Sequence, residues 1–157
     1  CIRDSIKYFL RLPIKSEYKI DDMADDGIQL LETLKIEKAH IFSTSMGGMI
    51  AQIISAQYPE KVKTFTLIAS TASTPSPINA PTRAVREIML QRSKNPNASY
   101  DEIIKREIKM VSLIGMEGRE VDTPEFRKET IENLDRSKDG SGYARQLLSI
   151  LASNDRL

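Results

Sequence analysis

The stretch Phe42-Ser-Thr-Ser-Met-Gly-Gly-Met-Ile50 decides the expected fold, because it joins an apolar run to a helix through small residues. Residues 38–44 predict a short β-strand that leads into this turn, and residues 47–58 predict the helix that follows it. A serine in a strand–turn–helix context is typical of the nucleophile elbow, Gly-x-Ser-x-Gly. Ser45 occupies the nucleophile position of that pattern.

The elbow needs small residues on both sides of the nucleophile, since the end of the strand and the start of the helix pass close together. Gly47 is the second glycine of the pattern, and Ser43 replaces the first with somewhat more crowding. We expect Ser45 to have a strained backbone that projects its hydroxyl above the sheet edge. The helix N-terminus would then favour a developing oxyanion, with the backbone N–H of Met46 as one donor.

The turn by itself leaves other interpretations open. Ser-x-Ser-x-Gly also fits a Gly-Gly helix start after any buried strand, or a phosphate-binding turn. The chain contains neither Gly-x-x-x-x-Gly-Lys nor Gly-x-Gly-x-x-Gly, so a standard nucleotide-binding loop is not expected.

The segments around the turn predict an α/β fold. A helix is expected over residues 21–35 and a second strand over residues 62–69, which gives the order helix, strand, helix, strand. Two strands joined by a helical crossover imply a parallel sheet. Asp21 or Asp22 is expected to cap the first helix. Its apolar face is predicted to comprise Met23, Ile28, Leu30, Leu31 and Leu34.

The second half of the chain predicts helices only. Residues 70–80 have the composition of a loop. A helix should begin near Pro81, and another should open at the capping box Ser99-Tyr-Asp-Glu102 and end at Gly115. Two more are expected, one from Thr123 and one over residues 142–153.

Composition excludes several classes of function. The 157 residues carry a net charge of +1, which gives no field for nucleic acid or an anionic membrane. No apolar run reaches the roughly 20 residues of a membrane span. Cys1 is the single cysteine, which fits a cytoplasmic protein without disulfides. The acids Asp21, Asp22, Asp25 and Asp26 suit a helix start better than a metal site, so no metal is predicted.

Several stretches together carry a family resemblance: Tyr18–Leu31, Lys38–Ile41, Ser45–Gln52, Tyr58–Val62, Leu67–Ser73 and Tyr143–Arg156. They resemble the α/β-hydrolase superfamily and are similar to the esterase-like hydrolases that include the aclacinomycin methylesterase type. The resemblance implies a partial hydrolase core over residues 1–72 and a helical cap or lid over residues 73–140. Residues 141–157 would be a helix returning to the core.

The resemblance also implies a catalytic triad in the chain order Ser, then Asp or Glu, then His. On this basis the acid and the histidine would follow Leu157, and the early strands would precede Cys1. We therefore expect a fragment that is inactive and marginally stable alone. His40, the single histidine, is five residues before Ser45 on the same strand, roughly 16 Å away, which is too far for a general base.

Two functional hypotheses follow from these observations. The first is a serine hydrolase that cleaves a small-molecule ester through an acyl-enzyme at Ser45, with no cofactor. The second is a non-catalytic ligand-binding or interaction protein with a degenerate elbow, which the serine at position 43 would suit. The sequence leaves the ester and the oligomeric state open.

Overall fold

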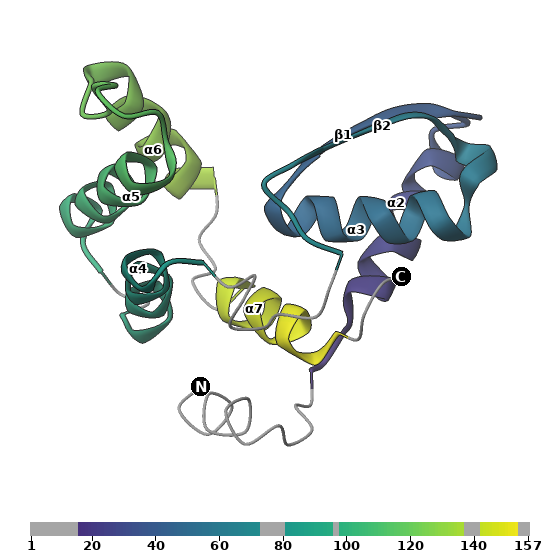
Figure 1. Cartoon of the computed structure of the whole chain (residues 1–157), viewed down its shortest axis with the longest axis horizontal. Helices are drawn as coiled ribbons and strands as arrows, with labels where there is room; N and C mark the ends of the chain where they lie inside the picture. The colour runs from purple at the N-terminus through teal and green to yellow at the C-terminus, as the bar shows by residue number, and fades with distance from the viewer. Residues whose placement is uncertain (1–15, 73–80, 96–97, 137–141, 154–157) are drawn as a thin grey trace. The chain divides into compact units, whose positions relative to one another are not determined.

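The computed structural model describes residues 16–72, 81–95, 98–136 and 142–153. The described residues before position 80 and those from Arg145 onward form one compact unit, the sheet unit, and residues Pro81–Ala144 form a second, the helical unit. Figure 1 shows the elements in chain order. They are α2 (Ile20–Thr33), β1 (Ala39–Thr44), α3 (Ser45–Gln57), the short 3-10 helix η1 (Pro59–Lys61), β2 (Val62–Ile68), α4 (Arg83–Lys94), α5 (Tyr100–Ile114), α6 (Pro124–Arg136) and α7 (Gly142–Ala152).

The sheet unit is built on a β–α–β crossover. Strands β1 and β2 are parallel and pair in a register that sets Thr44 opposite Ile68. Helix α3 connects them and covers one face of the pair, and α2 packs against α3 (Figure 1). The predicted α/β class and the predicted parallel pairing are therefore confirmed.

The core of the sheet unit lies between α2 and α3. Its buried members are Ile20, Ala24 and Ile28 from α2, together with Met49, Ile53 and Ile54 from α3. The predicted apolar face of α2 is wrong in part, because Leu30 and Leu34 are each 58% exposed. Residues two apart in a helix differ by roughly 200° in direction, so a face centred on Ile28 turns Leu30 away from α3.

Two hydrogen bonds involve the first half of α2: one caps its N-terminus, and the other links it to Tyr58, which ends α3. The N-cap of α2 is Lys19, and the Asp22 carboxylate accepts its backbone N–H at 2.6 Å. The expectation that Asp21 or Asp22 is the cap residue is wrong, since Asp22 acts from within the first turn. The Tyr58 hydroxyl donates to Asp25 at 2.9 Å, and this hydrogen bond raises the pKa of Tyr58.

The helical unit contains the elements expected from their capping signals. The Ser99 hydroxyl accepts the Glu102 N–H at 3.3 Å, and the Glu102 carboxylate accepts the Ser99 N–H at 2.8 Å. Gly115 ends α5, as predicted, and its N–H donates to the Val111 carbonyl at 2.7 Å. No helix in the described part of the chain is long and apolar enough to span a membrane.

Candidate active site

The turn at Ser45 joins a strand directly to a helix. Thr44 ends β1 with an extended backbone (φ −129°, ψ 149°), and Ser45 begins α3 with φ of +50°. A positive φ is uncommon for a residue other than glycine and costs of order 1–3 kcal/mol. The strain predicted for Ser45 is therefore present. Its side chain lies at the carboxyl end of β1 and is exposed to solvent.

The first turn of α3 leaves its backbone N–H groups available. Helices leave their first four N–H groups without a carbonyl partner inside the helix, and these include the N–H of Met46. Thr44, the N-cap residue, makes no side-chain capping bond to them. Hydrogen-bond donors and the positive end of the helix dipole thus gather beside the Ser45 hydroxyl, which is an arrangement that favours an anion.

Ser43 fits its position through a hydrogen bond. Its side chain is buried, and its hydroxyl donates to the carbonyl oxygen of Thr66 on β2 at 3.2 Å. The sequence predicts a more crowded turn at this position but not this bond. A buried hydroxyl with a partner carries little penalty, so serine can replace glycine here.

The close approach of helix and strand occurs at Gly48, one residue later than predicted. A Cβ atom at Gly47 would meet nothing within 4 Å outside its chain neighbours and its own helix. A Cβ atom at Gly48 would overlap Leu67 Cδ1 and lie 2.6 Å from Ser70 Cβ. The expectation that Gly47 must be small for steric reasons is therefore wrong. Successive helix residues turn by about 100°, and Gly48 is the one that faces β2.

A second left-handed turn lies beside the first. Ala69 follows β2 with φ of +49°, and its predecessor Ile68 pairs with Thr44, the predecessor of Ser45. Gln52 links helix α3 to the segment that follows β2. Its side-chain amide donates hydrogen bonds to the carbonyl oxygens of Gly48 at 3.0 Å and Thr71 at 3.3 Å. Sequence reasoning missed both features, because neither alanine nor glutamine signals such a role.

His40 lies at the opposite end of β1 from Ser45. Its Nδ1 is 2.8 Å from the Thr64 hydroxyl on the neighbouring strand. This cross-strand hydrogen bond accounts for His40 as a structural residue of the sheet. In the helical unit, Asp135 accepts a hydrogen bond from the Tyr100 hydroxyl at 2.6 Å.

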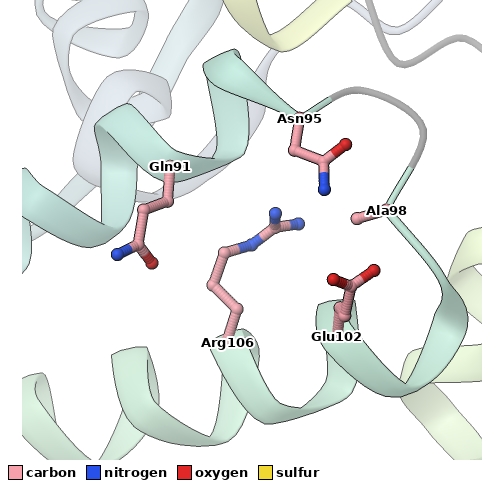
Figure 2. A pocket seen from close by; sticks show the side chains of 5 residues that line it. All are labelled: Gln91, Asn95, Ala98, Glu102 and Arg106. Atoms are coloured by element: carbon pink, nitrogen blue, oxygen red, sulfur yellow. The ribbon is translucent and has the colours of Figure 1, made fainter.

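A pocket of about 260 Å³ lies in the helical unit, between α4 and α5. Figure 2 shows the residues that line it, with the Arg106 side chain extending between Asn95 and Glu102. The hydrogen bonds that Ser99 donates to the Glu102 carboxylate hold the pKa of Glu102 below its usual range. Glu102 is therefore ionised at neutral pH and engaged in the helix cap. The five lining side chains include no nucleophile, so this pocket is not the candidate catalytic centre.

The comparison with known families agrees with the geometry at Ser45. The sequence profile of the alpha/beta hydrolase fold matches residues 6–107, which include β1, Ser45, α3 and β2. The chain belongs to the α/β-hydrolase fold family. In this family the elbow serine at a strained strand-to-helix turn is the nucleophile position. The expected family and fold are therefore confirmed, whereas the role of each site residue stays a prediction.

Individual relatives are distant and longer. Rhodomycin D methylesterase from Streptomyces sp. (strain C5) is 25% identical over 126 residues, which cover 71% of this chain and 42% of that enzyme. Homoserine O-acetyltransferase from Thermus thermophilus is 33% identical over 105 residues, which cover 64% of this chain and 27% of that enzyme. The chain thus spans less than half the length of these two curated relatives.

A solved structure shares the fold over nearly the whole chain. The crystal structure of a hydrolase from Pseudomonas aeruginosa matches with a TM-score of 0.57 and 15% sequence identity. The match covers 91% of this chain and 49% of that hydrolase. At this level of identity the likeness supports the shared fold and says nothing of the substrate.

Proposed function

We propose that this α/β-hydrolase cleaves a small carboxylic ester through an acyl-enzyme formed at Ser45. The observation that carries the proposal is the positive φ of Ser45 at the junction of β1 and α3, in a chain that matches the family over this turn. A strained, exposed serine beside free helix N–H groups combines a nucleophile with a binding place for the oxyanion.

The chemistry assigned to these residues is the two-step hydrolysis of an ester. The Ser45 Oγ attacks the acyl carbon, and the carbonyl oxygen takes up negative charge that the Met46 N–H stabilises. Collapse of this intermediate releases the alcohol and leaves the acyl group on Ser45. Water then attacks the acyl-enzyme and releases the acid, which restores the serine hydroxyl.

The general base is assigned to a histidine other than His40. The family order places the acid and the histidine after the serine in the chain, whereas His40 precedes Ser45. His40 is also hydrogen-bonded to Thr64, away from the elbow. A later histidine of the full-length protein would accept the Ser45 proton and return it to the leaving alcohol.

Two observations favour an enzyme over a non-catalytic binding protein. The serine at position 43, the main sign of a degenerate elbow, is accommodated by its hydrogen bond to the Thr66 carbonyl. The relatives include a methylesterase and an acyltransferase, and both names describe reactions at an acyl group. By resemblance to the family, we assign the helical unit to the cap.

Hydrolysis of p-nitrophenyl acetate by the full-length protein tests this proposal. We expect a burst of p-nitrophenol that approaches one equivalent of enzyme, followed by slower turnover. Ser45→Ala should remove the burst and lower turnover on the order of a thousandfold or more. Ser55→Ala serves as the matched control, because it removes a hydroxyl from the same helix and keeps the elbow and the nucleophile. Wild-type turnover by the Ser45→Ala variant would contradict the assignment.

A further inference from the structure

Gln52 occupies a bridging place that the reaction scheme leaves without a role. It lies two turns along α3 from Ser45 and is half-buried. Its amide nitrogen donates one hydrogen bond to the Gly48 carbonyl in the first turn of its own helix, at 3.0 Å. It donates a second to the Thr71 carbonyl in the segment after β2, at 3.3 Å. Both N–H bonds of the amide are thereby used.

The two segments that Gln52 joins are already in steric contact. Gly48 packs so closely against the end of β2 that a Cβ atom there would overlap Leu67 and crowd Ser70. The segment after β2 therefore cannot shift toward α3 without moving the first turn of the helix. Any rotation of that turn would also turn the backbone at Ser45, which lies in the same turn.

The strained conformation at Ser45 requires such restraints. A non-glycine residue in a left-handed conformation persists only where surrounding contacts over-determine it. The close packing of Gly48 sets how near the helix lies to the end of β2, and the Gln52 hydrogen bonds to Gly48 and Thr71 add a directional link between the two segments. Removing the bonds would leave the fold but loosen the orientation of the Ser45 hydroxyl and the Met46 N–H.

We propose that Gln52 is a positioning residue of this hydrolase, which fixes the nucleophile turn by tying the first turn of α3 to the segment after β2. The inference rests on the proposed function, because the effect is exerted through Ser45. Gln52 itself does not touch the reacting atoms. It acts on how fast Ser45 reacts and not on how tightly a ligand binds, since small displacements of a reacting group chiefly slow the chemical step.

The test is the rate at which a fluorophosphonate probe labels the full-length protein. Gln52→Met keeps the length of the side chain and removes both donors. Gln57→Met, on the exposed last residue of the same helix, is the matched control. We expect Gln52→Met to lower the labelling rate constant at saturating probe between about 10-fold and 100-fold. The probe concentration for half-maximal rate should change by less than about twofold, and Gln57→Met should match the wild type.

The rate constant separates positioning from stability. In a variant that only folds less completely, a smaller fraction of the protein is labelled, whereas each folded molecule still reacts with the wild-type rate constant. Gln52→Glu, which keeps the shape and replaces the donors by acceptors, gives a second variant in which the rate constant should also fall. A wild-type rate constant in both variants, or an equal fall in Gln57→Met, would overturn the positioning role. Undiminished labelling of Ser45→Ala would instead overturn the proposed function.

Discussion

At the scale of single residues, backbone strain gathers where the strands end. Among the described residues, Lys35, Ser45 and Ala69 are the non-glycine positions with positive φ. Lys35 closes α2, where a left-handed residue commonly ends a helix. Ser45 and Ala69 instead follow the two paired strands at the same sheet edge, where the active sites of open parallel sheets usually lie. The elbow motif predicts the first of these from sequence, whereas nothing about an alanine at position 69 predicts the second.

The two adjacent glycines of the elbow should respond differently to alanine. Gly48→Ala inserts a methyl group against Leu67 and Ser70, and overpacking of this kind costs roughly 1–3 kcal/mol. Gly47→Ala places its methyl group in open space on a helix, so its free energy of unfolding should stay within about 1 kcal/mol of the wild type. Urea unfolding of both variants checks the contrast. Equal losses would mean that the close approach is not at Gly48.

At the scale of elements, local signals predict boundaries better than they predict faces. The capping box at Ser99 and the glycine at position 115 mark both ends of α5, because caps depend on neighbouring residues only. The buried face of α2 depends on where α3 lies, because the order of residues in α2 is compatible with more than one apolar stripe. The predicted stripe therefore included Leu30 and Leu34, which are exposed, and left out Ile20 and Ala24.

The cap of α5 should give a pH-dependent stability. Hydrogen bonds from Ser99 lower the pKa of Glu102 in the folded protein, so Glu102 contributes stability above its ordinary pKa and loses it as the pH falls through the folded value. Ser99→Ala should destabilise the helical unit by about 1 kcal/mol at pH 7 and by less at pH 3. It should also move the pKa of Glu102 part of the way back toward its ordinary value.

Unfolding curves at the two pH values, with an NMR titration of the Glu102 carboxyl, measure both effects. Asp101→Asn is a suitable control, since it changes an exposed acid of the same turn that is not part of the capping box. An equal loss of stability at pH 7 and pH 3 in the Ser99→Ala variant would show that Glu102 does not depend on this cap.

At the scale of the whole molecule, the part of the chain that the structure describes contains one crossover of a parallel sheet and a second, helical unit. Each described strand has one neighbour, and on β1 Phe42 is 71% exposed. Such edges and apolar surfaces favour association with other chains. These features fit the expectation that the 157 residues alone are marginally stable. That expectation, and the expected lack of activity, stay predictions.

The order of strand, turn and helix was enough to predict the fold class and the strained backbone at Ser45, whose role as the nucleophile stays a prediction. The contacts that hold this turn could not be predicted, because they join residues far apart in the chain. Ser43 meets Thr66, and Gln52 meets Thr71, only once β2 has paired with β1. Sequence patterns report local conformation, whereas these hydrogen bonds depend on the register of the sheet.

The most direct test of the central claim is to map the residue that a fluorophosphonate probe modifies in the full-length protein. Digestion with trypsin releases the peptide of residues 39–61, which contains Ser43, Ser45 and Ser55, and fragmentation in the mass spectrometer locates the added mass. We predict modification of Ser45 alone within this peptide, and none in the Ser45→Ala variant. Modification at Ser43 or Ser55, or an unmodified peptide from an enzyme that hydrolyses esters, would contradict the assignment of Ser45 as the nucleophile.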